Sequence, residues 1–232
     1  MTASTTAVIA PAADTTVVQA TKPPAFIAVE GPIGVGKTTL AHRLAASFNY
    51  QTLLEEAEHN PFLERFYQNP KQHALPTQLH FLFDRVKKLQ ALRQGDIFQQ
   101  VRIADFLIDK DPLFAQLTLA NDELHLYQTV YDKVIGDLPK PDLVVYLQAS
   151  TDTLMERVHR RGLALERPIE RSYLSALNDA YTQFFYYYDA TPLLIVNAEQ
   201  INLADGDADY DNLLDYLLHH TNGRHYYNPT PL

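Results

Sequence analysis

A glycine-rich stretch near the start of the chain has the residues and the spacing of a phosphate-binding loop. The segment FIAVEGPIGVGKTTL runs from Phe26 to Leu40, and the apolar run FIAV precedes its glycines. The glycines, the lysine and the first threonine fit GxxxxGK[ST], in which backbone amides surround an anion, the lysine contacts the β and γ phosphates, and the hydroxyl ligates magnesium. The residues of this stretch predicted to bind nucleotide are Gly31, Pro32, Ile33, Gly34, Val35, Gly36, Lys37, Thr38 and Thr39. The sequence therefore predicts a site for ATP and Mg²⁺, with Lys37 as a catalytic cation and Thr38 as a metal ligand.

Acidic residues follow the next predicted strand, Gln51 to Leu54. Open α/β sheets place their ligands at this end of a strand. Phosphoryl transfer often needs a carboxylate that takes the proton of the acceptor, and Glu55 comes immediately after the strand. Glu56 and Glu58 are rivals for this role, and each of the three can instead be a solvated loop carboxylate.

Three arginines cluster at the end of a predicted helix, Thr151 to Arg161. Arg157 and Arg161 are four residues apart and lie on one helical face, with Arg160 beside them. A mobile basic lid can close over the transferred phosphate and exclude water. The alternative is favourable charge at a helix C-terminus.

The elements that must position these groups alternate between strand and helix. Apolar runs predict strands at 26–29, 51–54, 97–106, 142–149 and 192–198. Apolar residues at helical spacing predict helices at 39–48, 78–94, 112 to about 136, 151–161, 172–188 and 209–220. The order predicts an α/β fold with a parallel five-stranded sheet flanked by helices on both faces. We expect one domain at 25–220 with a lid at about 160–171, a disordered tail at 1–24 and a C-terminal tail at 221–232.

Composition argues against several kinds of partner and site. The formal charge of -9 disfavours nucleic acid, whose binding depends on clustered Lys and Arg. The chain has no cysteine, which excludes disulfides and cysteine-ligated metals and fits a reducing, cytoplasmic compartment. No apolar run approaches the roughly 18 residues of a membrane span, so we expect no membrane partner. His219, His220 and His225 lack the accompanying ligands of a metal site.

Taken together, the motifs resemble one family. In chain order they are GPIGVGKTTL, EEAEHNPFLERFY, LPTQLHFLFDR, DKDPLFA and ERVHRRGLALERPIERSYL, within about residues 26–198. Their order and spacing are similar to those of the deoxyribonucleoside kinases, most closely the bacterial deoxyadenosine and deoxyguanosine kinases. The resemblance implies a P-loop kinase fold and a magnesium-dependent transfer of phosphate from ATP to the 5′-hydroxyl of a deoxyribonucleoside, a step of nucleotide salvage.

The resemblance also implies roles for individual residues. The matching residues are Glu55 as the catalytic base, Gln78 and Arg85 as nucleobase ligands, Tyr67 and Glu166 as ligands of the sugar 3′-hydroxyl, and Arg157 and Arg161 as lid arginines. Gln78 and Arg85 are seven residues apart, which is two helical turns, so both face the same way. Without the resemblance, these two would be read as surface residues of a helix.

The chain departs from the family pattern after its third predicted strand. The family usually carries Asp-Arg-Ser or Glu-Arg-Ser here, whereas this chain has Ala-Asp-Phe at 104–106. Asp105 keeps the acidic, magnesium-side role, but the arginine that helps orient the catalytic carboxylate is missing. Arg102 or a lid arginine would have to compensate. The lid also has Leu163 where relatives often carry a further arginine.

The choice of nucleobase is open at the level of the residues. The Gln78 amide presents both donors and an acceptor, so it can pair with several bases. Arg85 needs an acidic neighbour, and Asp109 or Asp111 can hold it if their loop folds over the same helix. Such an aspartate can also accept from an exocyclic amine. The resemblance to bacterial purine enzymes implies that deoxyadenosine or deoxyguanosine is preferred over thymidine.

Two other functions compete with this interpretation. A nucleoside monophosphate kinase of the thymidylate type shares the fold, the loop and the lid, but needs extra arginines for its acceptor, whereas Glu55 suits a nucleoside. A nucleotide-dependent switch protein would not need the predicted acceptor pocket. The aromatic run YTQFFYYY at 181–188 is expected to pack a helix into the core or into a second subunit, with a stacking surface as the alternative. We expect a homodimer through long helices.

Overall fold

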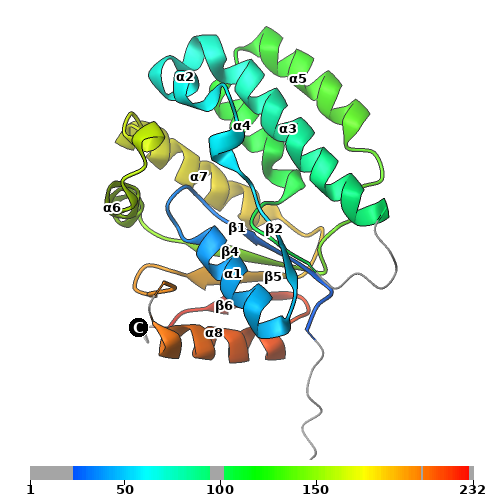
Figure 1. The fold of residues 1–232 in the computed structure, drawn as a ribbon, viewed down its shortest axis with the longest axis vertical. Coiled ribbons are helices and arrows are strands. Elements are labelled where there is room, and N and C mark those ends of the chain that lie inside the picture. Colours follow the sequence, from blue (N-terminus) through cyan, green and yellow to red (C-terminus); the bar gives the residue numbers. More distant parts are fainter. Residues whose placement is uncertain (1–22, 95–101, 205, 230–232) are drawn as a thin grey trace, which may run out of the picture.

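The apolar runs of the sequence form the strands of one parallel sheet (Figure 1). The structure, a computed structural model, describes residues 23–94, 102–204 and 206–229. Its strands are β1 (Phe26–Glu30), β2 (Gln51–Leu53), β3 (Arg102–Ala104), β4 (Leu143–Gln148), β5 (Leu193–Asn197) and β6 (Arg224–Tyr227). They lie in the order β2-β3-β1-β4-β5-β6, and every neighbouring pair is parallel.

The prediction of five strands is wrong, because the sheet has six. The additional strand, β6, lies within the predicted C-terminal tail and pairs with β5, with Leu193 opposite Arg224. Its sequence, RHYY, has no apolar run that would predict a strand. Arg224 fastens β6 to the end of helix α7 by donating to the carbonyl oxygens of Phe185, at 3.0 Å, and of Tyr188. The predicted tail at 1–24 and the 97–101 part of the third predicted strand lie almost wholly outside the described residues.

Helices cover both faces of the sheet. The α-helices are α1 (Lys37–Phe48), α2 (Leu63–Gln68), α3 (Pro70–Gln94), α4 (Asp111–Thr118), α5 (Asn121–Val134), α6 (Thr151–Arg161), α7 (Arg171–Tyr187) and α8 (Asp207–His219), and the 3-10 helices are η1 (Ala57–His59), η2 (Ile108–Lys110) and η3 (Ala164–Glu166). Figure 1 shows α1 and α8 on one side of the sheet and α3, α4, α5 and α7 on the other. The central strands are buried on both faces, as parallel strands between helix layers are, and Ile27, Val145 and Leu194 are fully covered.

The helix predicted from residue 112 to about 136 is two helices, α4 and α5. The chain becomes extended at Leu119 and Ala120, although neither glycine nor proline interrupts the sequence there. Glu123 stabilises the new start, because its side chain accepts from the Ala120 amide at 3.3 Å. In the described ranges, no helix has the length and apolar character needed to cross a membrane.

The sheet brings three loops together at one edge. Strands β1, β2 and β3 are parallel neighbours, with Ala28 and Leu53 both opposite Ala104. Their C-terminal ends therefore lie side by side, and the residues that follow them are a glycine-rich loop at 31–36, Glu55 and Asp105. This is the edge at which open α/β sheets bind ligands.

Candidate functional site

The glycine-rich loop at 31–36 turns tightly between β1 and α1. Gly31 has φ 150° and Gly34 has φ 85°, both outside the range that other residues adopt readily. A Cβ on Gly31 would lie 2.6 Å from the Leu147 carbonyl oxygen, and one on Gly34 would lie 2.9 Å from that of Leu154. These two positions therefore require glycine. The loop leads directly into the N-terminus of α1, whose free amides and dipole favour an anion.

Lys37, the first residue of α1, folds back over this loop. Its Nζ donates to the carbonyl oxygens of Gly31 at 2.8 Å and Pro32 at 3.3 Å. Burial lowers the pKa of Lys37, although the nearby carboxylates, above all Glu30, oppose that effect. The ammonium group is thus held over the loop, where a phosphate bound by the backbone amides would meet it.

Asp105 connects the start of α1 with the residue that follows β2. Its Oδ2 accepts from the Thr38 hydroxyl at 2.5 Å, and its Oδ1 accepts from the Glu55 amide at 2.6 Å. Hydroxyl and carboxylate oxygens are the ligands that Mg²⁺ prefers, so Thr38 and Asp105 fit the metal role predicted from the sequence. Burial raises the pKa of Asp105, and a bound cation would favour its ionised form. Among the described residues, no group of three His, Asp or Glu side chains forms a metal cluster by itself.

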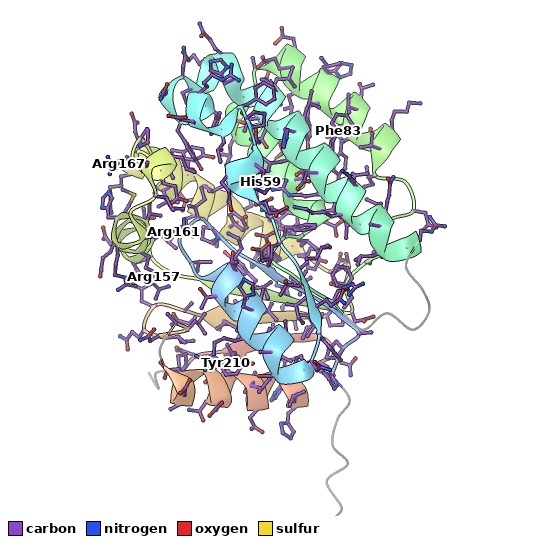
Figure 2. All side chains as sticks on the ribbon, viewed as in Figure 1. His59, Phe83, Arg157, Arg161, Arg167 and Tyr210 are labelled. Carbon is purple, nitrogen blue, oxygen red and sulfur yellow. The ribbon has the colours of Figure 1, made fainter. Side chains whose placement is uncertain are left out.

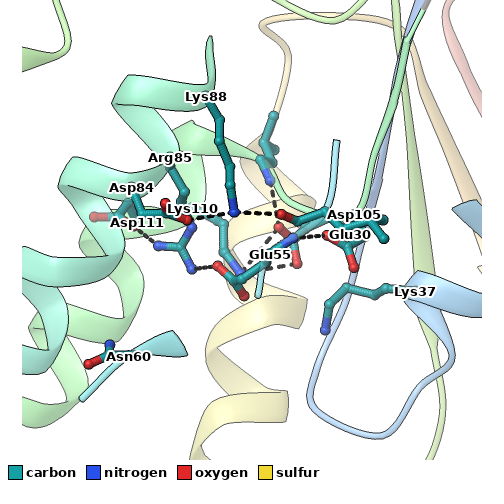
Figure 3. Close-up of polar contacts among 12 residues, drawn as sticks. Glu30, Lys37, Glu55, Asn60, Asp84, Arg85, Lys88, Asp105, Lys110 and Asp111 are labelled. Atoms are coloured by element: carbon teal, nitrogen blue, oxygen red, sulfur yellow. Dashed lines mark hydrogen bonds and ion pairs between the residues drawn. The ribbon is translucent and has the colours of Figure 1, made fainter. Parts of the chain in front are cut away.

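Glu55 lies between the loop and helix α3, where it forms an ion pair with Arg85 (Figure 3). Arg85 also pairs with Asp111 at the start of α4, and Asp111 accepts from the Tyr127 hydroxyl. Burial by itself would raise the pKa of Glu55, but the positive charges of Arg85, Lys110 and Lys37 outweigh it and lower the pKa to about 2. Glu55 is therefore an ionised carboxylate that only partly contacts solvent.

A cavity of about 400 Å³ opens beside Glu55. Gln78 and Arg85, both 3% exposed, reach it from α3, as two turns of one helix allow. Tyr67 from α2 and Glu166 from η3 also line it, and the guanidinium of Arg161 pairs with Glu166, with Nε 3.1 Å from Oε2. The structure thus brings the predicted acceptor residues together around one cavity, and Arg161 lies on its lid side.

A second cavity, of about 600 Å³, also borders the glycine-rich loop. It is lined by the loop, by α6 and by the segment after β5, and it also includes Arg161. Arg157 borders this second cavity and is tied to its rim, because it donates to the carbonyl oxygens of Val35 at 3.3 Å and Ala198 at 2.7 Å. Figure 2 shows Arg157, Arg161 and Arg167 on the same side of the molecule. The two cavities meet at Lys37 and Thr38, which line both.

Some predicted residues lie apart from this arrangement. Asp109 lines a separate cavity under α4 and α7, so Asp111 is the aspartate that holds Arg85. Arg102 is at the opposite end of β3, where it donates to Gln51. Glu56 borders the acceptor cavity but is half exposed and pairs with Lys88 at 3.1 Å. Glu58 also borders the cavity and is exposed.

Two buried residues next to the site were not predicted from the sequence. Glu30, at the end of β1, and Lys110, in η2, form an ion pair at 3.3 Å and are 0% and 1% exposed. Lys110 lines the acceptor cavity. One signal was available, because a glutamate ends an apolar strand immediately before the glycine-rich loop. Its partner 80 residues later carries no comparable signal.

Comparison with known proteins identifies the family. The model of the family described as deoxynucleoside kinase matches residues 27–221. This chain belongs to the deoxynucleoside kinase family. It is therefore a kinase, and the resemblance stated from the sequence motifs is confirmed.

Individual relatives agree with this assignment. The chain is 41% identical over 161 residues to a deoxyguanosine kinase of Bacillus subtilis, covering 67% of this chain and 76% of that protein. It is 28% identical over 200 residues to a deoxyadenosine/deoxycytidine kinase of the same organism, covering 83% of this chain and 91% of that one. A solved structure of a deoxyadenosine kinase from M. mycoides with bound dATP superposes with a TM-score of 0.72 at 27% identity, covering 83% of this chain and 98% of the other. Another structure of that enzyme, with dCMP and dCDP bound, gives the same TM-score at 26% identity, with the same coverage.

Proposed function

We propose that this kinase transfers the γ-phosphoryl group of ATP to the 5′-hydroxyl of a purine deoxyribonucleoside, with Mg²⁺ bound at Thr38 and Asp105. The position of Glu55 carries the proposal. This ionised carboxylate lies at the point where a cavity large enough for a nucleoside meets the glycine-rich loop. The binding of dATP by the M. mycoides deoxyadenosine kinase, which has the same fold, supports a nucleotide ligand.

The residues divide the reaction between them. The amides of the glycine-rich loop and Lys37 hold the phosphates and stabilise the charge of the transferred group. Thr38 and Asp105 would hold a magnesium ion, which would further neutralise the phosphates. Glu55 orients the acceptor hydroxyl and accepts its proton, and Arg161 approaches the transferred group from the lid. The lid role of residues about 160–171 and the P-loop role of residues 31–38 are part of this proposal.

The acceptor cavity favours a nucleoside over a nucleoside monophosphate. The carboxylates of Glu55 and Glu166 line it, and the guanidinium groups of Arg85 and Arg161 are already paired with carboxylates. An incoming phosphate monoester would meet this negative charge, because the cations that also line the cavity are engaged elsewhere: Lys110 is paired with Glu30, and Lys37 is held over the glycine-rich loop. The Tyr67 hydroxyl and Glu166 can instead bind the hydroxyl groups of a sugar.

The purine preference has two supports. The terminal nitrogens of Arg85 are paired with carboxylates, but its Nε has no hydrogen-bond partner among the described residues and is a donor that suits the O6 or N7 acceptor of guanine. Gln78 can pair with either purine through the choice of its amide orientation. The relatives are named deoxyguanosine kinase and deoxyadenosine/deoxycytidine kinase, so each name includes a purine deoxynucleoside, and the second also includes deoxycytidine. We therefore expect deoxyguanosine or deoxyadenosine to be preferred over thymidine.

The test is to incubate the purified protein with ATP, Mg²⁺ and each of the four deoxyribonucleosides or dGMP, and to separate the products. We expect purine deoxynucleoside monophosphates, and no diphosphate from dGMP. Lys37→Ala, which removes the cation of the loop, should abolish transfer while the circular dichroism spectrum is unchanged. Product from dGMP alone would contradict the acceptor assignment, and tenfold higher efficiency with thymidine would contradict the base preference.

We also propose a homodimer formed through α4 and α7. Leu117 of α4 is 39% exposed and Tyr187 of α7 is 73% exposed, and both line one cavity between these helices. Exposed large apolar side chains that gather on one face are typical of subunit interfaces. The adjoining aromatic residues Tyr181 and Phe185 pack inward against Tyr146. Residues of the aromatic run thus pack into the core on one face of α7, and on another face they would contact the second subunit.

A further inference from the structure

A buried lysine lies behind the proposed catalytic carboxylate. Lys110 is 1% exposed, and its Nζ lies 3.3 Å from Oε2 of Glu30 and 3.2 Å from the Tyr181 hydroxyl. Tyr181 donates to Oε1 of Glu30 at 2.9 Å, so its oxygen accepts from Lys110. Figure 3 shows Lys110 and Glu30 among Glu55, Asp105 and Lys37. The three buried groups of Glu30, Lys110 and Tyr181 form a closed network directly beneath the site.

Glu30 connects two loops of the site. Its Oε1 accepts at 2.8 Å from the amide of Gly31, the first residue of the glycine-rich loop. Its other oxygen accepts from the Leu107 amide at 2.8 Å, in the segment that begins with Asp105. One carboxylate therefore sets the distance between the phosphate-binding backbone and the proposed metal ligand. Burying a carboxylate without a partner is costly, and here the Lys110 ammonium group at 3.3 Å and the Tyr181 hydroxyl at 2.9 Å are its partners.

A cation that only neutralised Glu30 would not need to lie at the acceptor cavity, but Lys110 does lie there. It is part of the wall of the acceptor cavity, together with Lys37, Thr38 and Glu55. A fixed positive charge in such a wall, shielded from water, stabilises negative charge that spreads over the equatorial oxygens of a transferred phosphoryl group. It needs no reorganisation during the reaction, since Glu30 and Tyr181 already hold it in place.

We propose that Lys110 is a positioning residue for phosphoryl transfer. Through Glu30 it holds the glycine-rich loop against the Asp105 segment, and from the cavity wall it adds a fixed positive charge beside the reacting groups. This inference rests on the kinase function proposed above. It adds a residue for which neither the sequence pattern nor the family match indicates a role.

The test separates this charge from mere neutralisation of Glu30. Lys110→Met leaves a buried carboxylate unpaired, and we expect a midpoint of thermal unfolding lower by about 10 °C and a kcat lower by about 100-fold. The double variant Glu30→Gln with Lys110→Met removes both charges. It should recover most of the thermal midpoint, while kcat stays at least about tenfold below the wild type and the KM for the nucleoside stays within about threefold.

The controls distinguish the possible outcomes. Lys87→Met, at an exposed position of α3, should change neither kcat nor the thermal midpoint. A double variant with kcat within threefold of the wild type would show that Lys110 only neutralises Glu30, and would overturn the inference. If the double variant does not fold, Lys110→Arg decides, since it keeps the charge: kcat within about tenfold of the wild type supports the inference, and a greater loss overturns it. Failure of the wild-type protein to phosphorylate any nucleoside in the same assay would instead contradict the proposed function.

Discussion

Glu55 is held ionised by cations from three different elements. Arg85 comes from α3, Lys110 from η2 and Lys37 from α1, and together they lower its pKa to about 2 although burial acts in the opposite direction. Such a carboxylate is a weak base, so it is suited to orienting the acceptor hydroxyl and to receiving its proton late, as the hydroxyl oxygen loses electron density to phosphorus. Phosphoryl transfer through a loose transition state makes this limited demand on a base.

Replacing Glu55 should therefore affect the chemical step more than binding. We expect Glu55→Gln to lower kcat by about 100-fold or more, with little change in the KM for the nucleoside. Glu56→Gln is the matched control, because Glu56 is half exposed and paired with Lys88. Steady-state kinetics of both variants check the prediction. A large loss of kcat in Glu56→Gln, with Glu55→Gln still active, would show that Glu56 and not Glu55 is the base.

Because Arg85 is paired with Glu55, the stability of the fold should depend on pH in the acid range. The pKa of Glu55 is depressed to about 2, so the ionised form contributes stability above its ordinary pKa of 4.5, and this contribution is lost as pH falls from about 4.5 towards 2. Arg85→Met removes the largest attractive charge, so the pKa of Glu55 should rise. Acid unfolding followed by circular dichroism should then begin at a higher pH, and the acid limb of kcat should move the same way. Lys88→Met, on the same helix, should change neither the pH at which acid unfolding begins nor the acid limb of kcat, because Lys88 pairs with Glu56 and Asp84 instead of Glu55.

At the scale of elements, the sequence predicts those strands and helices whose residues form a local hydrophobic pattern. Continuous apolar runs identified β1, β4 and β5, because strands covered on both faces need such runs. The four residues of β6, Arg-His-Tyr-Tyr, do not form one, and its pairing with β5 makes it a strand. The break between α4 and α5 at Leu119 likewise has no glycine or proline to mark it. The first feature arises from tertiary pairing with β5, whereas the new start of α5 is stabilised locally by Glu123.

Gly162 ends α6 at the start of the proposed lid, in the left-handed conformation with φ 69°. A Cβ there would meet no atom closer than 3.9 Å, so Gly162→Ala introduces backbone strain without a clash. We expect a loss of about 1 kcal/mol in the free energy of unfolding, and a change of kcat and KM together, because hinge residues absorb the lid motion.

Gly136 provides the control for this prediction. It also has positive φ, 37°, with open space around it, but it lies after α5 and away from the site. Gly136→Ala should lower stability by a similar amount and leave kcat and KM unchanged. Equal kinetics for both variants, measured beside denaturant unfolding curves, would show that Gly162 only terminates a helix.

At the scale of the whole molecule, the candidate site consists of residues that the sequence could and could not reveal. Glu55 is predictable as one of three glutamates after a strand end, whereas Gln78 and Arg85 are singled out only by the family resemblance, and their two-turn spacing then places both at one cavity. The pair of Glu30 and Lys110 is separated by 80 residues, and only the packing of η2 against the end of β1 brings the two together. Arg102 donates to Gln51 at the opposite end of β3, and the cations that lower the pKa of Glu55 are Arg85 from α3, Lys110 from η2 and Lys37 from α1.

The proposed dimer can be tested with two tyrosines of similar exposure. Tyr187 on α7 is 73% exposed and Tyr226 on β6 is 64% exposed, but only Tyr187 lies on the face shared with α4. A charge buried in an apolar interface is costly, so Tyr187→Asp should shift the protein from dimer to monomer, whereas Tyr226→Asp should leave it dimeric. Sedimentation equilibrium of the wild type and both variants measures this. A monomeric wild type, or dissociation caused by Tyr226→Asp instead, would remove α4 and α7 as the interface.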